Sequence, residues 1–171
     1  MNKRIYFIGM PASGKTTLGK KLANKLSFSF VDLDWEIEKQ EQMSIPAIFS
    51  LHGEAYFRRV EQKILRKTLP VNAVIATGGG APCFFDNMDF ILNHGYSIFL
   101  NTPLETLSQR AWAKNGSRPL LQQTSIAALQ SAIQEKWENR KAYYHRAHYQ
   151  VNAGKDALES ILAHIEELTR I

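Results

Sequence analysis

Short apolar runs alternate with longer amphipathic stretches along this chain. The apolar runs have the length and composition of β-strands and cover Ile5–Gly9, Phe28–Val31, Ala73–Ala76, Ser97–Leu100 and Tyr149–Val151. Strands that are apolar throughout are typical of a sheet that is buried on both faces. The alternation therefore predicts an α/β fold, in which a parallel sheet is covered by helices on both sides.

The stretches between the apolar runs have helical periodicity. Leu18, Leu22 and Leu26 recur every four residues after the first strand and predict a helix there. Near the end of the chain, Asp156 is placed to cap a final helix, with Glu159 completing a capping box. We found no internal repeat or long linker, so the pattern favours a single domain over residues 1–171.

The first strand runs into a glycine-containing loop with a recognisable spacing. Residues Gly9–Thr16, GMPASGKT, consist of a glycine, four residues and then Gly-Lys-Thr. The backbone N–H groups of such a loop, and the N-terminus of the helix after it, point at phosphate oxygens. Lys15 can reach the β- and γ-phosphates, and the Thr16 hydroxyl can hold Mg²⁺. The loop predicts binding of a nucleoside triphosphate but does not identify the acceptor.

Two acidic residues follow the second strand, at Asp32 and Asp34. Because carboxyl ends of parallel strands share one edge, we expect both near the phosphate loop. If the chain stays extended, both side chains point the same way. Asp32 would then help to position Mg²⁺, and Asp34 would orient or deprotonate an attacking hydroxyl. Alternatively, Asp34 caps a helix that begins at Trp35.

Three consecutive glycines, Gly78–Gly80, follow the third strand at the same edge. Glycines let a ligand approach the backbone closely and leave backbone N–H groups accessible as donors. The alternative is a tight turn between strand and helix. That turn would need one or two glycines, whereas three favour a ligand contact.

Two arginines occupy positions where a helix would be expected to be apolar. Arg140 continues the apolar stripe of a helix that begins after Thr124, and this stripe consists of Ile126, Leu129, Ile133 and Trp137. An inward arginine is costly unless an anion meets it, so a ligand carboxylate or phosphate is a natural partner. The alternative is an arginine that extends its charge into solvent near the helix end.

Arg58 lies beside the face of another helix, formed by Phe57, Val60 and Ile64. Glu54 and Glu61 lie one helical turn away on either side. They would fix the direction of the guanidinium group for ligand binding, or else form a surface ion-pair array of little energetic weight.

Residues Ala113–Pro119 lack a buried pattern, and we expect them to form a mobile surface loop. Arg118 at its edge could swing over the phosphates and stabilise charge during phosphoryl transfer. Arg110 lies upstream on a helix and could stack on a base, but this residue taken alone favours solvent exposure.

Composition narrows the possible partners. The 171 residues carry a net charge of +5, 44% hydrophobic residues and one cysteine, Cys83. The lone cysteine favours a reducing compartment, and no stretch approaches the ~20 apolar residues of a membrane span. Because the basic residues are scattered, we expect a small phosphorylated ligand rather than nucleic acid. We therefore expect a cytoplasmic monomer without a membrane partner.

Together these motifs resemble the shikimate kinase family of P-loop proteins, from Ile5 to about Ala157. The resemblance rests on the combination of Asp-x-Asp, Phe-Arg-x-x-Glu, Gly-Gly-Gly, Arg-Pro-Leu and Arg-x-x-x-Tyr, found here at Asp32–Asp34, Phe57–Glu61, Gly78–Gly80, Arg118–Leu121 and Arg140–Tyr144. It implies five parallel strands in the order 2-3-1-4-5, a lid at about 111–121 and a substrate-binding subdomain at about 34–61. It also implies transfer of the ATP γ-phosphoryl group to the 3-hydroxyl of shikimate, with Mg²⁺ as cofactor.

The resemblance also assigns residues to each ligand. Shikimate is expected to contact Asp34, Arg58, Gly79, Gly80 and Arg140. The nucleotide is expected to contact Gly9, Met10, Pro11, Ala12, Ser13, Gly14, Lys15, Thr16, Thr17, Arg110, Arg118 and Asn152. The catalytic residues would be Lys15, Asp34 and Arg118, and the metal would lie at Thr16 and Asp32. Ala12 stands where many members of the family have glycine, which leaves the loop spacing intact.

Other functions compatible with the phosphate loop are a kinase for gluconate or a nucleoside monophosphate, a nucleotide-dependent nucleic-acid-binding protein, and an inactive nucleotide-binding regulator. A nucleotide acceptor would need a second base pocket, for which the sequence shows no motif. The arginine motifs at Arg58 and Arg140 favour the small hydroxy acid shikimate.

Overall fold

The sheet of this protein has five parallel strands in the order β2-β3-β1-β4-β5. The computed structural model describes residues 4–67, 70–113 and 125–169. The strands are β1 Arg4–Ile8, β2 Ser29–Asp32, β3 Ala73–Ala76, β4 Tyr96–Asn101 and β5 Tyr149–Asn152. The helices are α1 Lys15–Leu26, α2 Leu33–Glu41, α3 Ile45–Arg66, α4 Asn87–His94, α5 Leu104–Ala113, α6 Ile126–Tyr144 and α7 Ala157–Thr169, with a short 3₁₀ turn at Ala81–Cys83. The predicted fold class and strand order are confirmed.

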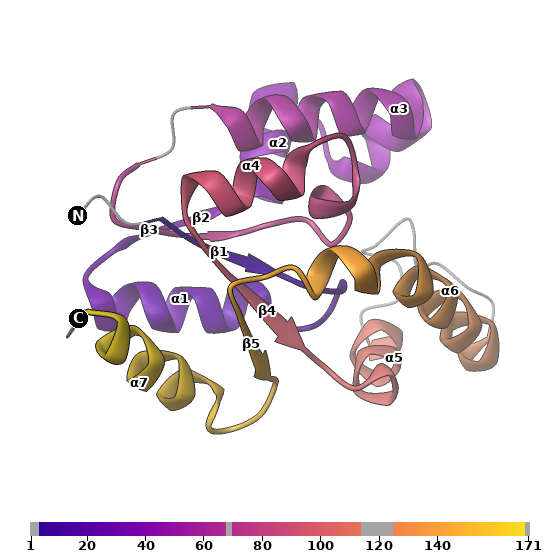
Figure 1. The fold of residues 1–171 in the computed structure, drawn as a ribbon. Helices are drawn as coiled ribbons and strands as arrows, with labels where there is room; N and C mark the ends of the chain where they lie inside the picture. Colours follow the sequence, from indigo (N-terminus) through magenta and orange to yellow (C-terminus); the bar gives the residue numbers. More distant parts are fainter. Residues whose placement is uncertain (1–3, 68–69, 114–124, 170–171) are drawn as a thin grey trace.

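Helices cover both faces of the sheet, as Figure 1 shows. One core lies between the sheet and helices α1 and α7, and β1 contributes Ile5 and Phe7 to it. The other core lies against α2, α3 and α4, and β1 contributes Tyr6 and Ile8. Because successive side chains of a strand point to opposite faces, alternate residues of one apolar strand serve both cores.

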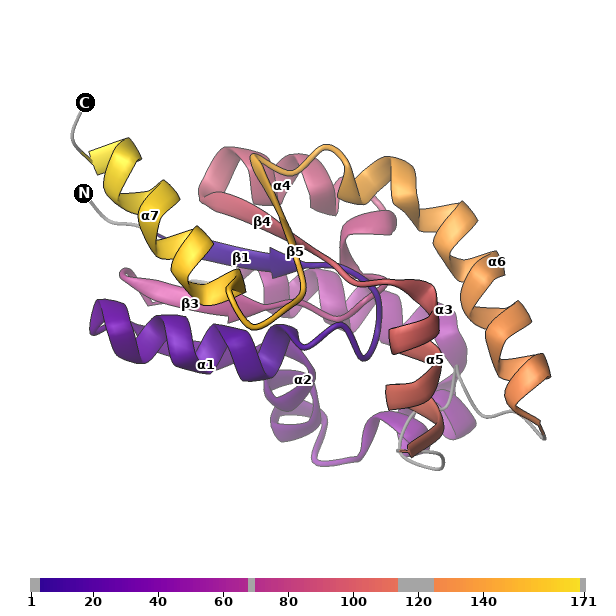
Figure 2. The ribbon, with the colours of Figure 1, turned by 90° about the horizontal axis from the view of Figure 1, so that it is seen from below.

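Helices α5 and α6 lie beyond the carboxyl ends of the strands, as Figures 1 and 2 show. Helix α6 begins at a Ser125 cap, whose hydroxyl accepts from the Ala128 N–H group. Its predicted inward stripe is confirmed from Leu129 onward, but Ile126 in the first turn is 44% exposed. The prediction for Ile126 was wrong because this side chain belongs to neither core, whereas Leu129 in the same turn packs into the core that contains Tyr6 and Ile8.

The register of the parallel strands places the loops that follow β1, β2 and β3 side by side. In the parallel ladder, Ala76 of β3 pairs with both Asp32 of β2 and Phe7 of β1. The next residue, Thr77, donates its N–H and its hydroxyl to the Phe7 carbonyl, at 3.1 and 3.0 Å. The chain therefore leaves β1, β2 and β3 at one level of the sheet edge, where ligands bind in open α/β folds.

Segment 34–61, which the resemblance assigns to substrate binding, consists of most of α2 and α3. The two helices are tied by the Glu38 carboxylate, which accepts from the Ile45 N–H at 2.9 Å, and by the Tyr56 hydroxyl, which donates to Glu41 at 2.6 Å. Helix α3 has a kink at Gly53, where φ is 78° and the backbone is not helical. In the described ranges no helix has both the length and the apolar character that crossing a membrane requires.

Candidate active site

The phosphate loop connects β1 to α1 and curls around the side chain of Lys15. The Lys15 ammonium donates to the carbonyls of Gly9 at 2.9 Å and Met10 at 2.8 Å. Helix α1 begins at Lys15, so its positive N-terminal end faces the same space. Ala12 adopts a φ of 64°, a left-handed conformation that glycine adopts more readily. The loop thus presents a cation and a helix end to an anion.

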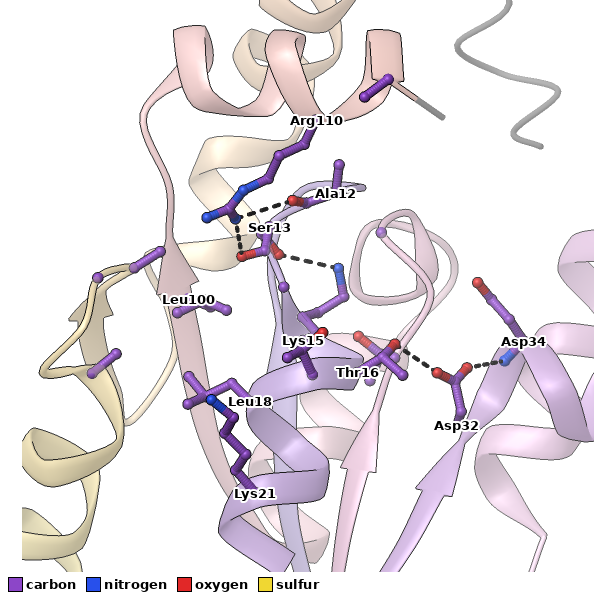
Figure 3. A pocket seen from close by; sticks show the side chains of 18 residues that line it. Ala12, Ser13, Lys15, Thr16, Leu18, Lys21, Asp32, Asp34, Leu100 and Arg110 are labelled. Carbon is purple, nitrogen blue, oxygen red and sulfur yellow. Dashed lines mark hydrogen bonds between the residues drawn. The ribbon is translucent and has the colours of Figure 1, made fainter. Parts of the chain in front are cut away.

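A cavity of about 570 Å³ opens over this loop. Figure 3 shows it from close by. Among the residues expected to bind ligands, those that line it are Ala12, Ser13, Gly14, Lys15, Thr16, Thr17, Asp32, Asp34, Gly79 and Arg110. The other lining residues were not expected from the sequence to bind ligands: they are Leu18, Lys21, Thr77, Leu100, Ala113, Ala153, Gly154 and Ala157. For Thr77 a signal existed, because it directly follows β3 at the sheet edge.

Asp32 joins the phosphate loop to the start of α2. The Thr16 hydroxyl donates to one carboxylate oxygen of Asp32 at 2.8 Å, and the Asp34 N–H donates to the other at 3.1 Å. Asp32 is therefore the cap of α2, and Asp34 lies in the first helical turn. The suggestion that Asp34 caps a helix beginning at Trp35 is wrong, as is the premise of an extended chain. The reason is that the Asp32 carboxylate accepts the Asp34 N–H and turns the chain into a helix immediately after β2.

Asp34 nevertheless lies at the pocket, beside Asp32 in Figure 3. Its neighbour across the pocket edge is Gly78, where an added Cβ would lie 3.0 Å from Asp34 Oδ1 and 2.5 Å from Glu61 Oε1. Two carboxylates thus approach the backbone at Gly78, and only glycine leaves room for them. This close approach explains one of the three consecutive glycines.

Arg58 is buried, with only 3% of its surface exposed. Its guanidinium group donates to Glu61 at 2.7 Å and to Glu54 at 2.9 Å, and lies over the Phe84 ring at 4.2 Å. The structure therefore supports the interpretation that the two glutamates fix the guanidinium direction, and excludes a solvated surface array. Both terminal nitrogens of Arg58 lie 2.7 Å from the place that a Cβ on Gly80 would occupy.

Arg140 approaches the same region from α6 and is 8% exposed. In the described part of the chain, no carboxylate lies within ion-pair distance of Arg140, in contrast to Arg58. Burial raises the pKa of Glu61 to about 7, while the positive charges of Arg58 and Arg140 oppose that rise. Both guanidinium groups thus act on one buried carboxyl, and neither faces bulk solvent.

Neither arginine lines the cavity; Arg58 lies directly behind the Gly78–Gly80 turn, and the charge of Arg140 acts on Glu61 and Cys83 nearby. Gly79 lines the cavity, and Gly80 packs on Arg58. A short turn therefore separates the nucleotide-side cavity from a buried, positively charged region. This geometry suits a small anionic acceptor placed next to a triphosphate.

Arg110 is exposed on α5 and donates to the carbonyls of Ser13 at 3.2 Å and Ala12 at 3.4 Å. Its guanidinium group thus lies across the phosphate loop, at the rim of the cavity. Asn152 accepts from the Asn101 side chain at 3.1 Å, and the two residues after it, Ala153 and Gly154, line the cavity. The proposed lid at 111–121 begins within α5, which extends to Ala113, and Arg118 lies outside the described residues.

Comparison with known proteins gives one consistent result. The family model described as shikimate kinase matches residues 11–169. The chain is 38% identical to a shikimate kinase of Bacteroides thetaiotaomicron, over 98% of this chain and 99% of that protein, and 40% identical to one of Persephonella marina, over 88% of each.

Solved structures agree with the sequence matches. The crystal structure of the Bacteroides thetaiotaomicron shikimate kinase superposes with a TM-score of 0.88 over 99% of both chains, at 38% identity. The shikimate kinase from Acinetobacter baumannii in complex with shikimate gives 0.87 at 34% identity, over 98% of this chain and 92% of that one. A gluconokinase from Sinorhizobium meliloti gives 0.56 at 13% identity, a likeness of fold alone. This chain belongs to the shikimate kinase family.

Proposed function

We propose that this chain transfers the γ-phosphoryl group of ATP to the 3-hydroxyl of shikimate, giving shikimate 3-phosphate and ADP. The observation that carries the proposal is the pair of buried arginines, Arg58 and Arg140, which both act on Glu61; Arg58 lies directly behind the glycine wall of the nucleotide cavity. Membership of the shikimate kinase family, and a relative described in complex with shikimate, support the same acceptor.

The nucleotide would bind with its phosphates in the loop Gly9–Thr16. Lys15 would leave its loop carbonyls and meet the β- and γ-phosphates, while the backbone N–H groups and the N-terminus of α1 bind the remaining oxygens. Arg110 and the residues around Asn152 would lie beside the base. Support for this placement comes from the cavity, which extends from the phosphate loop to Ala153 and Gly154.

Mg²⁺ would bind at Thr16 and Asp32. Their oxygens lie 2.8 Å apart at the cavity wall and belong to the hard donor type that this ion prefers. In the described residues, no group of three or more metal-binding side chains occurs, so phosphate oxygens and water would complete the coordination. When bound, the ion neutralises charge on the β- and γ-phosphates. The residues present therefore fit the ion.

Shikimate would bind with its carboxylate between Arg58 and Arg140. Because Arg140 has no acidic partner among the described residues, the ligand carboxylate would supply the missing negative charge. The ring would lie against Gly79 and Gly80, and its 3-hydroxyl would face Asp34 at the cavity edge. The Glu54 and Glu61 carboxylates hold Arg58 in place before the ligand arrives.

In the reaction, the 3-hydroxyl oxygen attacks the γ-phosphorus, and the bond from that phosphorus to the bridging oxygen of ADP breaks. Asp34 orients the hydroxyl and accepts its proton, which later passes to solvent. Lys15 stabilises charge on the transferring group, and Arg118 would add to this from a lid at about 111–121. Closure of that lid would exclude water and so prevent wasteful hydrolysis of ATP.

We also propose that the protein acts as a cytoplasmic monomer, without nucleic-acid or membrane partners. Lys15, Arg58, Arg110 and Arg140 all come from one chain, so the described part of the site needs no second copy. The scattered basic residues and the lone cysteine support the remaining points.

The test is ADP release by the purified protein with Mg²⁺ and ATP, comparing shikimate, gluconate, AMP and CMP as acceptors. We expect release with shikimate to exceed that with each other acceptor by more than an order of magnitude. AMP and CMP would each need a second base pocket, and gluconate is an open chain that must lose more conformational freedom than the shikimate ring in order to bind. Equal release with gluconate would reject the proposed acceptor and leave the family assignment unaffected.

A further inference from the structure

Tyr144, one helical turn after Arg140 in α6, lies where three parts of the site meet. Its side chain is completely buried, and its hydroxyl donates to the Gly79 carbonyl at 2.5 Å. The same oxygen lies 3.8 Å from the sulfur of Met10 in the phosphate loop. One hydroxyl therefore contacts the glycine turn and the phosphate loop from the helix that carries Arg140.

Packing fixes the direction of this hydroxyl. The Tyr144 ring stacks on Phe99 of β4, with centroids 5.3 Å apart and planes 24° apart, and also contacts Trp137. Burial raises the pKa of the Tyr144 hydroxyl, so it stays protonated and remains a donor at neutral pH. A rigid ring with an obligatory donor is suited to hold a backbone carbonyl in one place.

The carbonyl that it holds belongs to the residue between the two ligand regions. Gly79 lines the nucleotide cavity, and a Cβ there would lie 2.7 Å from the Pro11 ring of the phosphate loop. The next residue, Gly80, packs on Arg58. A shift of this turn would therefore change the separation between the phosphate loop and the acceptor arginines, to which in-line transfer is sensitive.

We propose that Tyr144 is a positioning residue, whose hydroxyl fixes the Gly78–Gly80 turn relative to both the phosphate loop and the arginine pair. The inference rests on the proposed function, since it takes Arg58 and Arg140 as the acceptor site. Tyr144 is not among the residues that line the cavity, and it acts through Gly79.

The experiment compares Tyr144→Phe with Tyr143→Phe in the full-length protein. Tyr144→Phe keeps the stacked ring and removes the hydroxyl together with its contacts to Gly79, Met10 and Arg140, whereas Tyr143 is the adjacent, half-buried tyrosine. We expect kcat/KM for shikimate to fall about tenfold in Tyr144→Phe, because a buried carbonyl loses its donor. ADP affinity of the enzyme without shikimate should stay within about twofold, and Tyr143→Phe should match the wild type in both.

A double-mutant cycle with Arg140→Ala separates positioning from general weakening of the fold. If Tyr144 acts by placing the acceptor site, its removal should cost much less once Arg140 is absent. Full additivity, a kcat/KM for shikimate within twofold of the wild type, or an equal loss of ADP affinity would each overturn the inference. If the wild type fails to phosphorylate shikimate, the proposed function fails instead, and the two failures are distinguishable.

Discussion

At the scale of single residues, Arg58 and Arg140 show two ways of burying a positive charge. Arg58 has two glutamate partners on its own helix, so its charge is met before any ligand binds. Arg140 is nearly as buried, yet no acidic partner lies within ion-pair distance in the described ranges. A buried charge without an ion-pair partner is costly, so Arg140 should gain more than Arg58 from a ligand carboxylate.

Replacing Arg140 by Ala should therefore weaken binding of the acceptor more than binding of ATP. We expect the KM for shikimate to rise in line with a loss of about 2–4 kcal/mol, with little change in the KM for ATP. Steady-state kinetics with each substrate varied in turn gives both constants. The matched control is Lys141→Ala, since Lys141 is half-exposed and pairs with Glu138 on the surface. An unchanged KM for shikimate in Arg140→Ala would remove Arg140 from the site.

At the scale of elements, the Gly78–Gly80 turn lies between the cavity over the phosphate loop and the buried Arg58. Each glycine has a different neighbour: carboxylates at Gly78, the Pro11 ring at Gly79 and the Arg58 guanidinium at Gly80. A side chain at any of these positions must displace something that the site uses. The turn is thus built for close approach of backbone to side chains from α2, α3 and the phosphate loop.

Gly80→Ala should damage acceptor binding while leaving the fold intact. The new methyl group would lie 2.7 Å from both terminal nitrogens of Arg58, so the guanidinium group must move away from its position. Because a side-chain end can yield more easily than backbone, we expect a small drop in melting temperature and a rise of about tenfold in the KM for shikimate. Calorimetry and kinetics measure the two effects.

The matched control is Gly154→Ala, at a glycine where an added Cβ has no neighbour within 4 Å among the described residues. Its KM for shikimate should equal that of the wild type. A similar rise in that KM for both variants would show that the close approach at Gly80 is not the cause.

At the scale of the whole molecule, Glu61 links the orientation of Arg58 to stability. Its side chain is 1% exposed, and its Oε1 atom has no hydrogen-bond partner within the described structure. Burial raises the pKa of Glu61 from 4.5 to about 7, Arg58 opposes the rise, and the nearby Asp34 adds to it. Glu61 therefore orients Arg58 from a buried position that disfavours the charged form of Glu61 itself.

The pH dependence of unfolding should reveal this cost. Between about pH 4.5 and 7 the folded state holds the Glu61 proton more tightly than the unfolded state, so the free energy of unfolding falls as pH rises. Relative to Glu61→Gln, the wild type should lose up to about 3 kcal/mol over this range, with no further change above it. Urea unfolding of both proteins at pH 5 and pH 8 measures the difference.

Glu54→Gln is the control, because Glu54 pairs with the same arginine but is 47% exposed. In Glu54→Gln the free energy of unfolding should fall with rising pH as steeply as in the wild type. If the free energy of unfolding changes equally with pH in the wild type and in Glu61→Gln, the Glu61 proton is not held more tightly in the folded state.

Local sequence signals were sufficient to predict most of the fold and the phosphate loop. Apolar strands and leucine spacing depend on burial alone, and the loop from Gly9 to Thr16 carries its own chemistry in consecutive residues. The helix start after β2 could not be derived, because it depends on whether the Asp32 carboxylate accepts the Asp34 N–H. Both extended and helical backbones are open to this segment, and spacing does not choose between them.

The sequence by itself therefore determined the α/β class, the strand order through its resemblance, and which residue types could meet phosphate. Only the tertiary structure decided that Arg58 and Arg140, far apart along the chain, are buried around Glu61, and that Tyr144 reaches Gly79. The physical reason is the separation of these residues along the sequence. Periodicity indicates which face of a single helix or strand is buried, whereas contacts between elements depend on how whole helices pack across the sheet edge.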